Sequence, residues 1–287
     1  MMPDHVHHGA SGMGAELILA VPALAAAIVY LSATVLEGRR GRPWPWHRTV
    51  CWIAGTMCAA AGFFGPLASA AHDSFVAHMA AHLLVGMVAP LLLVLAAPVT
   101  LALRALSVDP ARRLSRLLRS PIAHVFTHPV VAAVLNVGGI WALYLTPLYD
   151  LMQRDMLVHW LVMLHFVIAG YLYTAALIGI DPAPHRPGFV LRAAVLVVSL
   201  AGHGVLAKLL YADPLPGVPP AEAHAGAELM FYGGDAVEFV IIVLLCAEWY
   251  RVTGRQLRSV ASAVGRQPTR TRLRSPRTRP STKGASA

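Results

Sequence analysis

The sequence predicts an all-α fold that crosses a membrane several times. Of its 287 residues, 57% are hydrophobic and only 13% are charged, whereas about 25% of the residues in a typical soluble domain are charged. The apolar residues also come in runs long enough to cross a bilayer, which takes about 20 residues per helix. Together these observations favour a polytopic membrane protein over a soluble one.

Seven apolar segments, separated by polar links and Pro- or Gly-rich turns, set the expected order of the chain. We expect three parts: a polar tail at 1–13, a transmembrane domain at 14–250 and a basic, disordered tail at 251–287. The first tail carries His and Met, which leaves a loose metal-binding role open. The expected transmembrane helices are about 14–36, 49–70, 74–103, 129–147, 155–179, 189–211 and 228–250.

The basic residues predict how these helices are oriented. In a seven-helix arrangement, all of the 23 lysines and arginines except Arg154 and Lys208 lie on one side of the membrane. Positively charged loops stay in the cytoplasm. We therefore expect the N-terminus outside, the C-terminus in the cytoplasm and the protein in the plasma membrane.

One basic loop, 104–128, contains a predicted surface helix that begins at Asp109-Pro110. Arginines lie on one side of this helix and leucines on the other, a pattern typical of helices that lie on an anionic membrane surface. Membrane lipids are therefore expected partners, and nucleic acid is not. The arginines are Arg112, Arg113, Arg116 and Arg119, and the leucines are Leu114, Leu117 and Leu118.

Polar residues inside the expected helices indicate a functional site, because the bilayer penalises them. His78 and His82 are four residues apart and project from one face of a helix. At 1.5 Å per residue, His78 lies about 6 Å from the outer end of its helix and His82 one turn deeper. His159, His203 and the acids Asp235 and Glu238, which are three residues apart on one helix face, fall in the outer halves of three other helices. The sequence thus predicts one outward-facing site.

The donor types in this site favour copper. Met79 lies beside the histidine pair and Met163 shares a helix face with His159, and imidazole with thioether suits copper better than magnesium or calcium. The three cysteines are scattered without a C-x-x-C spacing, which excludes an all-thiolate zinc site. His165 is either a ligand or a hydrogen-bonding strut between helices. The expected metal residues are His78, His82, His159, His203, Met79, Met163, Asp235 and His165.

Several motifs occur in a fixed order between residues 70 and 250. They are His78-Met79-x-x-His82, Ala89-Pro90, Pro98, His128-Pro129, Trp141-Ala142-Leu143-Tyr144-Leu145, Pro147-Leu148-Tyr149-Asp150, His159, His165-Phe166, Asp181-Pro182, His203 and Asp235. This ordered set resembles the CtaG family of cytochrome c oxidase assembly factors. The resemblance implies a protein without catalytic turnover that helps to assemble a haem–copper oxidase, with oxidase subunits as partners and copper delivery as its task.

Two other functions remain open from the residues alone. In a b-type cytochrome, histidines on facing helices ligate haem, but the second histidine of the His78/His82 pair would then be redundant. A copper transporter would need polar groups through the full depth of the membrane, whereas the cytoplasmic halves of the expected helices are almost purely apolar. The sequence does not set the oligomeric state.

Overall fold

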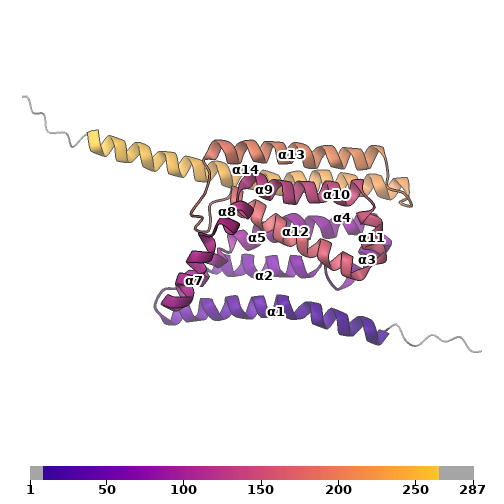
Figure 1. Cartoon of the computed structure of the whole chain (residues 1–287), viewed down its shortest axis with the longest axis horizontal. Helices are drawn as coiled ribbons and strands as arrows, with labels where there is room; N and C mark the ends of the chain where they lie inside the picture. The colour runs from indigo at the N-terminus through magenta and orange to yellow at the C-terminus, as the bar shows by residue number, and fades with distance from the viewer. Residues whose placement is uncertain (1–8, 265–287) are drawn as a thin grey trace, which may run out of the picture. The chain divides into compact units, whose positions relative to one another are not determined.

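The protein is described by a computed structural model that gives the backbone of residues 9–264 and the side chains of residues 21–255. Over this range the chain forms helices and no strand, which confirms the all-α fold (Figure 1). The helices are α1 (Gly9–Arg39), α2 (Trp46–Ala60), α3 (Pro66–Asp73), α4 (Phe75–Leu83), η1 (Leu84–Val88), α5 (Ala89–Leu95), α6 (Pro98–Ala105), α7 (Val108–Leu118), α8 (Pro121–Phe126), α9 (Pro129–Ala133), η2 (Val134–Gly138), α10 (Gly139–Leu145), α11 (Leu148–Arg154), α12 (Met156–Leu177), α13 (Phe189–Ala212) and α14 (Pro220–Val264).

Five helical segments are long and apolar enough to cross a membrane, and a pair bent by 79° makes up to six within the described residues. The second of the seven expected spans, 49–70, falls short. Its helix α2 has 15 residues and reaches about 22 Å, less than the roughly 30 Å of a hydrocarbon core. The chain leaves α2 through a turn in which Gly65 adopts φ 88°. The five segments are Val21–Arg39, Phe75–Ala105, Met156–Leu177, Phe189–Ala212 and Pro220–Arg255, and the bent pair is Pro129–Leu145 with Leu148–Arg154.

The two prolines in the expected segment 74–103 act differently. Pro90 follows the π-helical turn η1, because a proline ring crowds the carbonyl four residues earlier, here Gly86, and a wider turn makes room. Pro98 begins α6 after a full break, where Ala97 adopts a left-handed conformation with φ 52°. The side chain of Asp181 accepts hydrogen bonds from the first amides of α6 and so caps it.

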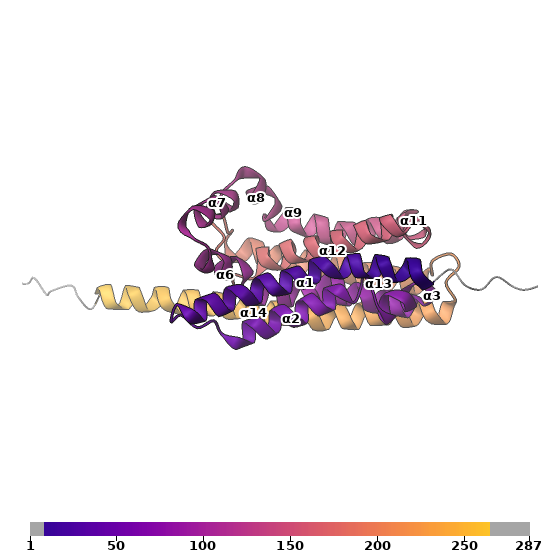
Figure 2. The same cartoon turned by 90° about the horizontal axis from the view of Figure 1, so that it is seen from below.

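Helix α1 lies along α2 in both views (Figures 1 and 2) and also packs against α6. A buried carboxylate, Glu37, joins these elements at one end. It accepts hydrogen bonds from Arg40, Arg42 and Arg104 at 3.2, 3.1 and 3.0 Å. Further along, the hydroxyl of Tyr30 donates to the carbonyl of Ala96 at 2.8 Å. These bonds tie α1 to the segment that carries the central histidines.

The expected tails differ from the observed helix ends. Residues 9–13 already belong to α1, and residues 251–264, expected to be disordered, continue α14. Arg, Gln, Leu and Ala in this stretch have high helix propensity, which accounts for the extension. Among the described residues, 9–248 belong to one compact unit and 249–264 to another. His5, His7 and His8 of the N-terminal tail and residues 265–287 lie outside the described residues.

Candidate metal site

His78 and His82 both lie on α4, as their spacing predicts, and both side chains are buried. The residues at the start of α4 cap the helix. Ser74 occupies the N-cap, and its hydroxyl accepts the amide of Ala77 at 3.5 Å. The backbone amide of Phe75 donates to the carboxylate of Glu222 at 3.0 Å. The start of α4 is therefore fixed, and with it the direction of both imidazoles.

The ring of His78 is oriented by a tyrosine that the sequence analysis did not select. The Nε2 atom of His78 lies 3.1 Å from the hydroxyl of Tyr144, which in turn donates to the sulfur of Met79 at 3.6 Å. When Nε2 donates to this hydroxyl, it carries the single proton of the neutral imidazole. Nδ1, which has no hydrogen-bond partner, then presents its lone pair. This is the form in which histidine binds metals.

His82 is the most isolated polar group of the site. Its side chain is only 2% exposed, yet neither ring nitrogen has a hydrogen-bond partner. The ring lies edge-on to Phe166, with centres 5.3 Å apart, and nearly parallel to the ring of His203 at 6.5 Å. Gly86, one turn further on, leaves space for it. An unpaired group inside a membrane costs several kcal/mol unless something binds it.

His203 brings the site to α13 and α14. Its Nε2 is buried without a partner, and its Nδ1 lies 3.9 Å from the carboxylate of Glu238. The imidazole packs on Gly234, where a Cβ would overlap the ring. Glu238 is buried, whereas Asp235, the acid expected at the site, is exposed. Glu238 is therefore the acid beside His203, and a role for Asp235 at the site stays a prediction.

His159 and His72 form a second pair of neighbouring histidines. His159 is buried on α12, and its ring centre is 5.0 Å from that of His72. His72 is exposed at the end of α3, and its Nδ1 donates to the carbonyl of Ala68 at 2.8 Å, which leaves Nε2 free to bind. The sequence analysis did not select His72. The signal for it was its place in the polar link six residues before His78.

The remaining predicted metal residues, His165, Met163 and Met79, make contacts that suit a structural role. The Nε2 of His165 donates to the carbonyl of Leu135 in η2 at 3.0 Å, the geometry of a strut between helices. Met163 and Met79 are buried in the same apolar cluster as Phe166 and Tyr144. They fill the space around the imidazoles with side chains that pack well and carry sulfur.

The histidines are arranged as pairs and not as a preformed cage. Among the described residues, no three His, Cys, Asp or Glu side chains lie close enough together to hold a metal ion. The histidines form a row from the pair His72–His159, of which only His72 is exposed, to the buried pair His82–His203, and His78 lies on the same helix as His82. A metal held by three of these imidazoles requires side-chain rotation.

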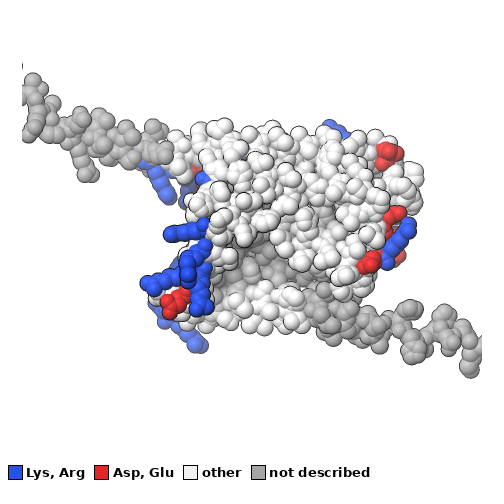
Figure 3. All heavy atoms as spheres, viewed as in Figure 1, with Lys and Arg blue, Asp and Glu red and all other residues white. Residues whose placement is uncertain are grey.

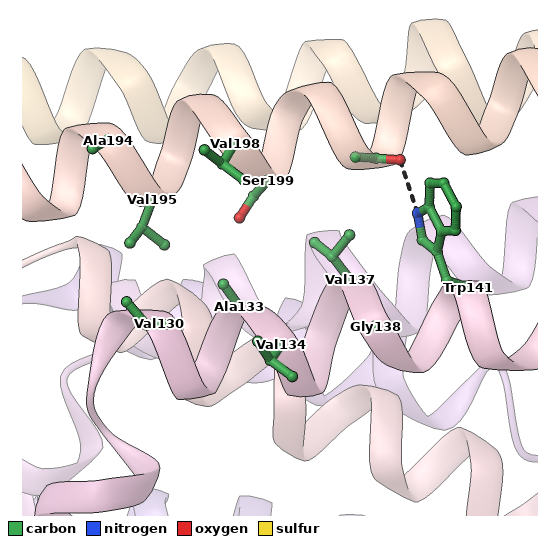
Figure 4. Close-up of a pocket in the computed structure, with 11 residues that line it drawn as sticks. Val130, Ala133, Val134, Val137, Gly138, Trp141, Ala194, Val195, Val198 and Ser199 are labelled. Carbon is green, nitrogen blue, oxygen red and sulfur yellow. Dashed lines mark hydrogen bonds between the residues drawn. The ribbon is translucent and has the colours of Figure 1, made fainter.

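A small polar cavity adjoins His203. Its volume is about 20 Å³, enough for about one water molecule, and the unpaired hydroxyl of Tyr173 also lines it. Val137 and Ser199 separate this cavity from an apolar groove of about 520 Å³ between α9–α10 and α13 (Figure 4). Trp141 closes one end of that groove by donating to the carbonyl of Gly202 at 3.0 Å. Other polar residues around the cavity are Asn136 and Thr174.

Comparison with known proteins supports the resemblance found in the sequence. The sequence profile of the cytochrome c oxidase caa3 assembly factor family (Caa3_CtaG) matches residues 28–252. An uncharacterized protein of Mycobacterium leprae is 32% identical over 259 residues, and uncharacterized proteins of Mycobacterium bovis and Mycobacterium tuberculosis are each 33% identical over 263. These alignments cover 82% of this chain in the first case and 84% in the other two.

The chain spans about two fifths of the length of these relatives, since each alignment covers 39% of the relative. No solved structure matches the chain. The match to the family profile includes α4, α12, α13 and the part of α14 that carries Glu238. The chain therefore belongs to the family of cytochrome c oxidase caa3 assembly factors.

Proposed function

We propose that the protein holds copper transiently at its row of buried histidines and passes it to a subunit of a haem–copper oxidase during assembly. Copper is a cargo in this proposal, and the protein carries out no catalytic turnover. Copper delivery goes beyond what membership of an assembly-factor family implies for any one chain. It needs support from the residues themselves.

The observation that carries the proposal is the set of unpaired imidazole nitrogens in the interior. Nδ1 of His78, both nitrogens of His82, Nδ1 of His159 and Nε2 of His203 have no hydrogen-bond partner. Imidazole without a competing hydrogen bond is a ready ligand for copper. Glu238 beside His203 offers a negative charge to balance a bound cation. Met79 and Met163 supply thioether sulfur nearby in the core.

We also propose seven transmembrane spans, with α2 as a short span, the N-terminus outside and the C-terminus in the cytoplasm of the plasma membrane. The support is the charge distribution: Lys and Arg side chains gather at the end of the bundle where α6 and α7 lie (Figure 3). Loops on the cytoplasmic side carry an excess of such residues. In this orientation the exposed His72 faces the outside, where copper arrives.

The experiment compares two double variants that each remove a histidine pair with i, i+4 spacing. H78A/H82A empties the proposed site, and H124A/H128A is the matched control at the basic end of the bundle, where these two rings are 6.4 Å apart. Each protein is purified from membranes and its copper content is measured. We expect copper in the wild type and in the control, and little or none in H78A/H82A.

A parallel measurement links copper to oxidase assembly. Host membranes carrying H78A/H82A should contain the protein at normal level but less active haem–copper oxidase than membranes with the control variant. Equal copper content in both double variants, or normal oxidase activity with H78A/H82A, would show the proposal to be wrong. A visible spectrum of the same purified protein distinguishes copper from haem, whose strong absorption bands would contradict a copper cargo.

A further inference from the structure

A groove of roughly 640 Å³ lies between the end of α6 and α7, away from the histidines. Apolar side chains form one part of its lining and cationic ones the other. Arg112, Arg116 and Arg119 succeed one another at intervals of four and three residues, so they share one face of α7. The other lining residues are Leu103, Leu106, Val108, Ala111 and Ser115.

The groove lies at the level where a bilayer changes from hydrocarbon to headgroups. Helix α6 ends the apolar segment Phe75–Ala105, which is long enough to cross the membrane. Leu103 and Leu106 therefore mark the end of the hydrocarbon zone, and α7 follows directly after it. Figure 3 shows Lys and Arg side chains gathered at this end of the bundle.

The arginines of the groove are available to an external anion. Within the part of the chain that the structure describes, no carboxylate pairs with Arg116 or Arg119, and Arg112 reaches only the exposed Asp109 at 3.9 Å. The neighbouring Arg104 differs, because the buried Glu37 binds it at 3.0 Å. Guanidinium groups bind phosphate through paired hydrogen bonds. The arginines of the groove therefore carry charge that is available to a ligand, whereas the charge of Arg104 is balanced by Glu37.

We propose that this groove binds the phosphate headgroup of an anionic phospholipid, with its acyl chains lying along Leu103 and Leu106. The cationic side of the groove selects the headgroup charge, and the apolar side selects a lipid over a soluble phosphate. The lipid then holds α7 against the bundle at the membrane surface. This site is independent of the histidine row, so its failure would leave the copper proposal unaffected.

The test measures lipid retained by the purified full-length protein in native mass spectrometry. Phosphatidylglycerol and phosphatidylcholine with identical acyl chains are added at equal concentration. We expect the wild type to keep phosphatidylglycerol preferentially, and R112Q/R116Q/R119Q to lose that preference. A single substitution, R116Q, should weaken retention about fivefold, since one basic residue near a membrane surface contributes roughly that factor.

The matched control is R113Q, which removes the same charge from the same helix but from a residue that does not line the groove. It should retain phosphatidylglycerol as the wild type does. Equal losses in R113Q and R116Q, or no preference for phosphatidylglycerol in the wild type, would overturn the proposal. Displacement of the lipid by millimolar inorganic phosphate alone would also overturn it, by identifying a soluble anion as the ligand. Thermal unfolding of each variant confirms that it is folded.

Discussion

The ring centres of His82 and His203 lie 6.5 Å apart although the residues come from α4 and α13, 121 positions apart in the sequence. With metal–nitrogen bonds of about 2 Å and ring radii of about 1 Å, two imidazoles on opposite sides of one ion have centres roughly 6 Å apart. The observed separation is close to this value. A cation between the two rings therefore needs only side-chain rotation and no movement of the helices.

Glu238→Gln is expected to weaken copper binding by roughly tenfold, the effect typical of losing an outer-shell partner of a metal ligand. The buried carboxylate lies 3.9 Å from His203 and balances the charge of the cation, and the amide cannot. Competition with a chromophoric copper chelator measures the affinity. Asp235→Asn is the control, because that side chain is exposed. A larger loss in Asp235→Asn would assign the charge-balancing role to Asp235 instead.

His165→Ala is expected to lower thermal stability and leave copper content unchanged. The substitution removes the hydrogen bond to the carbonyl of Leu135, and an unpaired polar group of this kind costs about 1–3 kcal/mol. Thermal unfolding in detergent and metal analysis are measured on the same preparation. His82→Ala is the comparison, since His82 makes no hydrogen bond but faces the proposed site. Loss of copper in His165→Ala would make His165 a ligand and not a strut.

Gly170→Ala is expected to destabilise the bundle by about 1–3 kcal/mol, because the new methyl group collides with backbone that cannot move aside. It would meet the carbonyl of Gly86 and the ring of Pro90, where α12 packs on η1. The control is Gly38→Ala on α1, which has nothing within 4 Å and should be neutral or slightly stabilising. Unfolding midpoints in the same detergent report both. Equal midpoints would mean that α12 and η1 are not in tight contact.

Glu37→Gln is expected to loosen α1 from the rest of the bundle. The carboxylate is the shared acceptor for Arg40, Arg42 and Arg104, and a neutral amide would leave three guanidinium groups without a counter-charge. Limited proteolysis of the loop between α1 and α2 should become faster. Asp109→Asn should have no measurable effect, because exposed ion pairs contribute little. An unchanged cleavage rate in Glu37→Gln would show that the cluster does not hold α1 in place.

The sequence predicts the apolar helices well because length, composition and Pro or Gly breaks are local properties. The start of α7 at Val108, one residue before the expected Asp109, and the helical spacing of His78 and His82 are examples. A continuous helix over 49–70 is not observed, since α2 stops at Ala60 and a turn follows. Hydropathy alone does not reveal that break, because residues 61–64 are as apolar as a helix interior.

The site was predicted less completely because it depends on which helix faces meet. Asp235 and Glu238 are three residues apart on α14, and only the packing of the neighbouring helices decides that Glu238 is buried. Tyr144 and His72 gain their roles from rings that lie far away in sequence. No periodicity in a single segment encodes such contacts. The histidines could be predicted because polar residues inside apolar helices are recognised from the sequence alone.

The π-helical turn η1 sets the angular position of the histidines relative to everything that follows it. It contains one residue more than an α-helical turn would need. Deleting Val85 would allow a continuous α-helix, but His78 and His82 would then turn by about 100° around the helix axis and face away from His203. Substitutions in Leu84–Val88 keep the angular position of His78 and His82, whereas a change in the length of this turn does not. Insertions and deletions in this five-residue turn should therefore abolish the site even where the helix itself is preserved.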